Sequence, residues 1–255
     1  MIGRCLLTAL MLGWGIAAHA IVNIEALHTG EPPRGYSGTA NVSVDGQSGN
    51  TDKLGVNAGA RLQWHGGTVT NFAILRYSYG QTSGIEDTNK LFTHARHIRQ
   101  VSDKTAYEGF IQAERNIFNR LSFRGLLGGG IRLKLADTPD IKTIHLGLGG
   151  FFSRETLEKR AGTTDAGSDN TWRVNTYLNY VQQLNQSVRV LSTTYYQPAV
   201  DDFSDFRLLE DATLSVKMTD TLSLNLSLNL AHDSKPPQSV KNTDTTYSTG
   251  VEYSF

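Results

Sequence analysis

The sequence predicts an all-β protein, a single antiparallel transmembrane β-barrel of about 12 strands with short periplasmic turns and longer outer loops. In the final stretch, Tyr247, Thr249, Val251, Tyr253 and Phe255 share one face of a strand and polar residues occupy the other. Segments with the same alternation recur along the chain, and their connections alternate between short and long. In a transmembrane barrel the apolar face meets lipid and the polar face lines the lumen.

Residues 1–20 are typical of a secretory signal peptide. Arg4 precedes an apolar run from Cys5 to Ala18, and Ala18-His19-Ala20 has the pattern of a cleavage site. The run is shorter than the roughly 20 residues of a spanning helix, and an amphipathic or buried first helix is the alternative. Because Cys5 is the one cysteine, the mature chain has none and is long enough to fold without disulfides.

Residues 21–35 are a lead-in, broken at Pro32-Pro33, that is either a periplasmic arm or a plug, and residues 36–255 are the expected barrel. The expected strands are 36–45, 54–64, 69–79, 89–101, 105–118, 120–135, 141–157, 172–180, 188–196, 206–218, 222–230 and 247–255. An even strand number places both termini on the periplasmic side. A secreted β-sandwich would explain the alternation, but it would not explain the loop asymmetry or the aromatic terminus.

Connections near residues 66–67, 102–104, 136–140, 184–186 and 219–220 are short. Those at 80–87, 158–170, 197–205 and 232–244 are longer, as expected for outer loops. The first loop and the turn at Asn119 are exceptions, because each is short where an outer loop is expected.

Many charged residues fall on the face expected to line the lumen. These lumen-lining candidates are Arg61, Arg76, Arg96, Glu108, Glu114, Arg124, Arg132, Arg173, Arg189, Asp211, Lys217 and Glu252. Buried charges must be paired or hydrated, so one interpretation is a set of ion-pair networks that fill the lumen. In the other interpretation, the arginine excess lines a narrow pore that prefers anions, since charged rings set pore selectivity.

Enzymatic and metal chemistry receive little support. The chain has no Gly-x-Ser-x-Gly elbow, and His94, His145 and His232 lie on separate segments. Without a cysteine or a His-Glu-x-x-His motif we expect no metal site and no cofactor, and loop aspartates such as Asp202 and Asp205 are expected to be solvated rather than to bind calcium. The 24 basic and 24 acidic residues balance, which gives no case for nucleic acid as a partner.

The terminal pattern Tyr247, Val251, Tyr253 and Phe255 resembles the assembly signal of bacterial outer-membrane barrels. The stretches 36–44, 48–52 and 118–130, with the lead-in 22–25, resemble an uncharacterised outer-membrane family whose members are labelled as salt-induced proteins. The resemblance implies a barrel in the bacterial outer membrane. Its partners would then be outer-membrane lipid, lipopolysaccharide and the barrel-assembly machinery.

No functional residue is carried over from the family, because its activity is unassigned. We expect a structural or narrow-channel protein, with a role in osmotic stress as the label suggests. An outer-membrane enzyme acting on lipid or lipopolysaccharide is the alternative.

Overall fold

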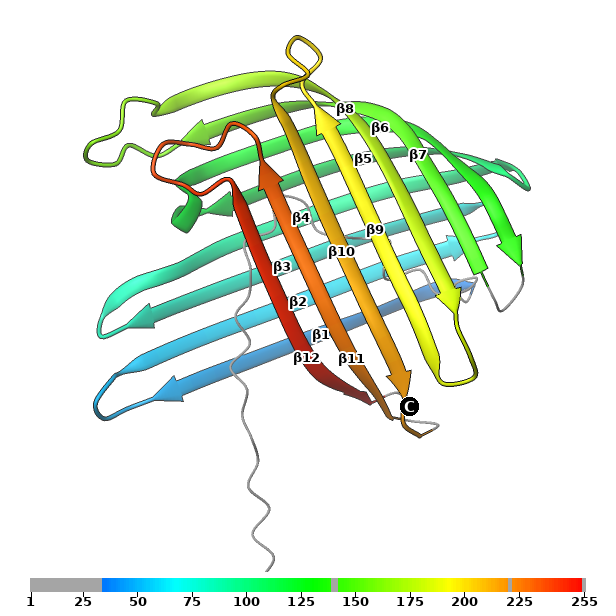
Figure 1. Ribbon diagram of the computed structural model, residues 1–255, viewed down its shortest axis with the longest axis horizontal. Coiled ribbons are helices and arrows are strands. Elements are labelled where there is room, and N and C mark those ends of the chain that lie inside the picture. The colour runs from blue at the N-terminus through cyan, green and yellow to red at the C-terminus, as the bar shows by residue number, and fades with distance from the viewer. Residues whose placement is uncertain (1–33, 139–141, 220–221, 254–255) are drawn as a thin grey trace, which may run out of the picture.

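The computed structural model describes residues 34–138, 142–219 and 222–253, and within them twelve antiparallel strands form one sheet in sequence order (Figure 1). The strands are β1 (Gly35–Gln47), β2 (Lys53–Gly66), β3 (Val69–Thr82), β4 (Ile85–Ser102), β5 (Thr105–Asn116), β6 (Leu121–Thr138), β7 (Lys142–Leu157), β8 (Gly167–Gln183), β9 (Val188–Pro198), β10 (Phe206–Lys217), β11 (Leu222–Asp233) and β12 (Thr243–Tyr253). The predicted fold class is confirmed. The signal peptide, nearly all of the lead-in and Phe255 lie outside the described residues.

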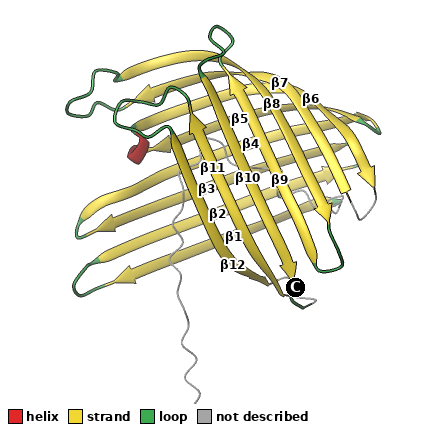
Figure 2. Ribbon diagram, in the orientation of Figure 1, coloured by secondary structure: helices red, strands yellow, loops and turns green. Residues whose placement is uncertain are grey.

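The sheet curls so that β9–β12 pass in front of β1–β4, which gives it an inner and an outer face (Figure 1). Strands β1 and β12 are the two edges, and the described residues form no ladder between them. One end, here named the loop rim, carries the connections 48–52, 83–84, 117–120, 158–166, 199–205 and 234–242. The opposite end, the turn rim, carries turns such as 67–68, 103–104 and 184–187 (Figure 2).

Some predicted boundaries at the loop rim are wrong. The expected loop 80–87 is a two-residue turn, Ser83-Gly84, because β3 and β4 continue their ladder to the pair Thr82–Ile85. Strand β8 begins at Gly167, so the expected loop 158–170 is shorter. Strand β5 ends at Asn116, where the short 3₁₀ turn η1 (Ile117–Asn119) replaces the last residues of the expected strand.

The two faces of the sheet are inverted relative to a water-soluble protein. In β5 the inward-facing Glu108, Gln112 and Glu114 are buried, while the outward-facing Tyr107 and Ile111 are more than half exposed. Water-soluble proteins bury apolar residues and expose charged ones. A buried polar face with an exposed apolar face is the pattern of a barrel surrounded by lipid. No helix in the described part of the chain has the length and apolar character to cross a bilayer.

The interior is filled unevenly around the barrel. Three small apolar clusters lie inside the wall formed by β3–β10, namely Phe72/Ile74/Phe92, Phe110/Leu126/Phe151 and Tyr177/Tyr195/Leu209. The His94 ring stacks between Phe92 and Phe110, with centroids 6.2 and 5.9 Å away. In contrast, no described side chain of β1, β11 or β12 is buried. The interior therefore has a packed half, centred on β4–β9, and an open half towards the two edges.

Candidate functional site: the polar interior

A buried charge cluster lies in the packed half. Arg96 of β4 donates from Nη1 to Oε2 of Glu108 on β5 at 3.2 Å, and both side chains are almost fully buried. The Tyr177 hydroxyl of β8 donates to the same oxygen at 3.1 Å, and Arg132 Nη1 donates to that hydroxyl at 3.3 Å. Because β8 is not a neighbour of β5, this Tyr177 bond crosses the interior. The cluster thus supplies the pairing that buried charges require.

A second cluster, the mouth cluster, lies nearer the loop rim. Glu155 of β7 accepts from Arg124 (Nη2–Oε2, 3.0 Å) and from Arg207 of β10 (Nη1–Oε1, 2.6 Å). Arg124 also donates to Glu114 of β5 at 2.6 Å, and Arg207 Nε donates to Asp233 of β11 at 3.1 Å. Three carboxylates and two guanidinium groups thereby form a continuous bridge from β5 to β11.

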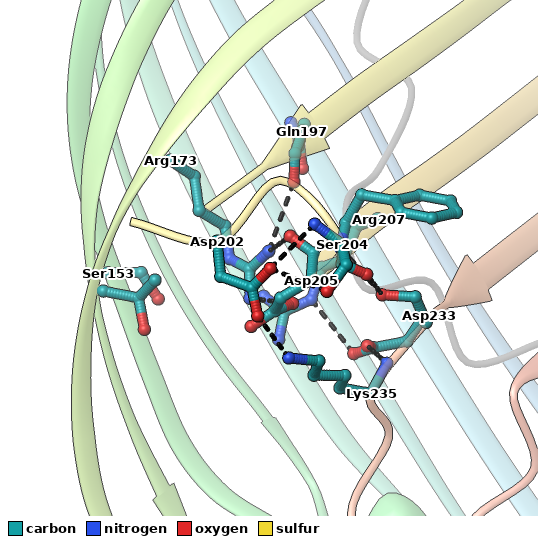
Figure 3. A network of polar contacts seen from close by, with 12 residues as sticks. Ser153, Arg173, Gln197, Asp202, Ser204, Asp205, Arg207, Asp233 and Lys235 are labelled. Carbon is teal, nitrogen blue, oxygen red and sulfur yellow. Dashed lines mark hydrogen bonds and ion pairs between the residues drawn. The ribbon is translucent and has the colours of Figure 1, made fainter. Parts of the chain in front are cut away.

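Further ion pairs bind the loops to this end of the barrel (Figure 3). Arg173 of β8 pairs with Asp205 at 2.8 Å and donates to the Gln197 carbonyl at 3.2 Å. Asp202, in the same loop as Asp205, pairs with Lys235 of the next loop. The pKa of Asp202 is lowered, mainly because Lys235 donates a hydrogen bond to its carboxylate. These loop carboxylates therefore pair with basic side chains.

Arg120 joins three segments at the loop rim. It follows η1, has a left-handed backbone (φ 59°), and its side chain is almost fully buried. Its terminal nitrogens donate to both carboxylate oxygens of Asp165 at 3.1 and 2.7 Å, and to the Gln238 carbonyl at 2.8 Å. Further bonds reach the Glu158 carbonyl and the Thr163 hydroxyl. The loops 158–166 and 234–242 are thus clamped together, and this set is named the loop clamp.

A cavity of about 70 Å³ lies between the mouth cluster and loop 234–242. Glu114, Arg124 and Arg207 line it on the barrel side, and Pro237 and Lys241 line it on the loop side. The loop therefore approaches the mouth cluster closely enough to narrow this end of the interior.

The open half places its charges differently. Arg76 and Lys217 face inward, because they alternate in phase with buried residues of β3 and β10, yet both are exposed. Arg61, Arg189 and Asp211 also face inward and are partly exposed. These side chains border open space inside the barrel. Such a position allows water to hydrate their charges.

The twelve lumen-lining candidates therefore fall into three groups. Six are buried in the packed half and take part in ion pairs or hydrogen bonds, namely Arg96, Glu108, Glu114, Arg124, Arg132 and Arg173. Five border the open half, namely Arg61, Arg76, Arg189, Asp211 and Lys217. Glu252 belongs to β12, but its side chain lies outside the described ones, as do those of Val251 and Tyr253, whereas Tyr247 is 85% exposed.

Sequence reasoning missed residues that complete the clusters. Glu155, Arg207 and Asp233 link the mouth cluster, and Arg120 and Asp165 form the loop clamp. Alternation could have identified Glu155, because it shares a face with the buried Phe151 and Ser153. No local pattern identifies Arg120, whose partners are 38 to 118 residues away in sequence.

The histidines lie in separate surroundings. His94 is enclosed by aromatic rings and by Gln112, 3.2 Å from its Nδ1. His232 is on the outer face near the loop rim, where its Nδ1 is 2.8 Å from the Thr243 hydroxyl. Among the described residues, no group of three or more His, Asp or Glu side chains is placed to hold a metal ion.

The chain matches the profile of one protein family over most of its length. The profile described as "Protein of unknown function, DUF481" matches residues 40–255. The chain belongs to the DUF481 family. No curated protein sequence matches it significantly. The match begins inside β1 of this DUF481 member, so the family covers nearly all of the described sheet.

Solved structures with a similar fold include two porins and the translocator domain of an autotransporter. The NanC porin has a TM-score of 0.49 at 10% identity, covering 86% of this DUF481 chain and 98% of the porin. The translocator domain of the autotransporter NalP from Neisseria meningitidis has a TM-score of 0.45 at 14% identity over 88% and 90% of the two chains. The KdgM porin has a TM-score of 0.41 at 12% identity over 86% and 99%.

Proposed function

We propose that this protein is a bacterial outer-membrane barrel that forms a narrow, anion-preferring channel. The observation that carries the proposal is the charge of four strands that border the open half. Basic side chains, among them Arg61, Arg76, Arg189 and Lys217, occupy the inward faces of β2, β3, β9 and β10. On the described inward faces of these four strands, Asp211 is the one acidic residue. Charged side chains along a pore set its ion selectivity, so this wall favours anions.

The packed half explains why the channel is narrow. Its buried polar groups are paired across the lumen: Arg207 forms an ion pair with Glu155, and Tyr177 donates a hydrogen bond to Glu108. These pairs and the three apolar clusters occupy space that a wide porin leaves to water. The remaining path runs along the basic wall.

The test is planar-bilayer recording of the folded protein under a potassium chloride gradient. A heat-dependent shift on a gel confirms beforehand that the barrel is folded. We expect discrete conductance steps and a reversal potential of the sign that chloride preference produces. A cation-selective reversal potential, or a folded barrel that never conducts, would contradict the proposal.

A lipid-modifying enzyme is the second candidate, favoured by one observation. His232 and Thr243 form a hydrogen-bonded pair on the outer face beside Phe206, where lipid would approach. A histidine next to a hydroxyl group can act as its general base. Release of fatty acid from lipid or lipopolysaccharide by the purified protein, abolished in His232→Ala, would establish this activity.

Two further proposals follow from the sequence resemblances. We propose that the terminal strand carries the signal read by the barrel-assembly machinery, and that the protein acts under osmotic stress. The first predicts that deletion of Phe255 lowers the yield of heat-modifiable barrel in membranes. The second predicts a higher abundance of the protein in cells grown at high salt, and equal abundance at low and high salt would contradict it.

A further inference from the structure

The outer face of β5–β8 is apolar along most of its length. Its outward residues include Tyr107, Ile111, Leu127, Leu148 and Leu178, all exposed. At the turn rim, Lys142 lies over the ring of Tyr180, 5.9 Å from its centroid. Such a face is suited to contact with hydrocarbon chains.

Two arginines interrupt this face near the loop rim. Arg115 is next to the last residue of β5, and Arg154 is three residues before the end of β7; both are exposed. No ion pair within the described part of the chain involves either of them. The described outward residues of β5–β8 also include no carboxylate, so nothing on this face neutralises the two charges.

Aromatic rings lie near the arginines on the same face. Phe152 and Trp172 are in contact on β7 and β8, with centroids 5.3 Å apart, one pleat from Arg154 towards the middle of the strands. The Phe123 ring lies over Gly125, where an added Cβ would be 3.0 Å from it. Aromatic residues in barrels mark the membrane interface, so Arg115 and Arg154 are at the level of lipid headgroups. There the cost of an outward arginine is small, whereas it is large at the bilayer midplane.

The separation of the two arginines defines the ligand further. Arg154 pairs with Gly125, which pairs with Ala113, two residues before Arg115. Two strand spacings and a two-residue rise place their Cα atoms roughly 12 Å apart. Guanidinium groups bind phosphate through paired, charge-assisted hydrogen bonds. Two phosphates at opposite ends of a disaccharide fit this span, with acyl chains lying along the apolar face below.

We propose that Arg115 and Arg154 bind the two phosphates of a diphosphorylated glycolipid headgroup, the lipid A part of lipopolysaccharide. The Phe123 ring forms the floor between the two phosphate positions, and Phe152 and Trp172 contact the first methylene groups of the acyl chains. The inference rests on the proposed outer-membrane location with the loop rim facing outward. It does not depend on the conductance of the lumen.

The test is native mass spectrometry of the detergent-solubilised protein titrated with lipid A. The probes are diphosphoryl lipid A, monophosphoryl lipid A, a lipid A without phosphates, and inorganic phosphate. Arg115→Gln and Arg154→Gln are compared with Arg99→Gln, an exposed outward arginine at the turn rim.

We expect diphosphoryl lipid A to bind about fivefold more weakly to each single variant and about 25-fold more weakly to the double variant, because a basic residue at an anionic lipid surface contributes about that factor. Arg99→Gln should bind as the parent does. With monophosphoryl lipid A, one of the two single substitutions should lose its effect, and inorganic phosphate alone should not compete.

Equal binding by the double variant and Arg99→Gln, or equal binding of phosphorylated and phosphate-free lipid A, would overturn the proposal. Competition by inorganic phosphate would identify a free-ion site instead of a lipid site, and would overturn it as well. Conductance in bilayers that lack lipid A tests the proposed channel separately, so the two proposals can fail independently.

Discussion

Arg207 of β10 holds the carboxylate of Glu155 on β7 with both terminal nitrogens, at 2.6 Å (Nη1–Oε1) and 3.0 Å (Nη2–Oε2). Strands β8 and β9 separate the two in the sheet, so the pair spans the interior rather than a ladder. Arg124 approaches the same carboxylate from β6, so that Glu155 is the shared anion of two guanidinium groups. The curvature of the barrel is thereby fixed from inside as well as by backbone hydrogen bonds.

Replacing Glu155 should weaken the barrel strongly. In Glu155→Gln, Arg124 and Arg207 would face each other without their shared negative charge. Loss of one partner from a buried pair costs about 3–5 kcal/mol, and we expect a decrease of about 3 kcal/mol in the free energy of unfolding. Urea unfolding in lipid vesicles, followed by tryptophan fluorescence, measures it. The control is Asp137→Asn, which breaks the exposed pair with Lys134 and should change the free energy by less than about 1 kcal/mol.

The packed half should also resist added volume. A Cβ on Gly147 would lie 1.9 Å from Cε1 of Tyr177. The Tyr177 ring is fully buried, and the hydrogen bond from its hydroxyl to Glu108 holds it in place. We expect Gly147→Ala to destabilise the barrel by about 1–3 kcal/mol in the same unfolding assay. In Gly109→Ala the new Cβ meets its nearest atom at 3.9 Å, so that variant should unfold as the parent does. Equal stability of the two variants would show that Tyr177 moves freely.

The anion preference should follow the basic wall of the open half. Arg76→Glu replaces an exposed, inward-facing positive charge with a negative one, so the reversal potential should shift towards cation preference. Arg99→Glu makes the same charge change on the outer face at the turn rim, and should leave selectivity nearly unchanged. If both variants shift the reversal potential equally, the path of the ions does not pass Arg76.

The sequence predicted the sheet well because alternation is a local property. The alternate leucines of β11, from Leu222 to Leu230, identify a strand and its two faces without any knowledge of its neighbours. The interior was harder to predict. Phe92 and His94 share the inward face with Arg96, so apolar and charged residues occur on one face and the binary pattern becomes ambiguous.

The clusters depend on which strands face each other after the sheet curls, and that is not a local property. Arg207 and Glu155 are 52 residues apart in sequence, and Arg120 and Gln238 are 118 apart. Alternation predicts that these side chains point inward or lie at a turn, but it does not predict which residues they contact. Those contacts depend on the curvature of the sheet and on the courses of the loops.

The loop clamp should open in acid. Hydrogen bonds from the Arg120 side chain, and then from the Gln238 amide, lower the pKa of Asp165, and the Lys235 bond lowers the pKa of Asp202. Both folded-state pKa values lie below the unfolded value of about 3.9. The carboxylates therefore stabilise the loops fully above about pH 4, and this stabilisation is lost as the pH falls through the folded-state pKa values.

Pepsin cleavage of loops 158–166 and 234–242 measures this opening, because the protease is active at acid pH. We expect slow cleavage at pH 5, and cleavage that becomes progressively faster as the pH falls from about 4 through the folded-state pKa values. In Arg120→Gly the left-handed backbone is kept without strain while the guanidinium is lost, so the loops should exchange amide hydrogens faster already at pH 7. Asp103→Asn, at the turn rim, should behave as the parent at every pH. Loops that stay protected in Arg120→Gly would show that backbone packing, not the arginine, holds the two loops together.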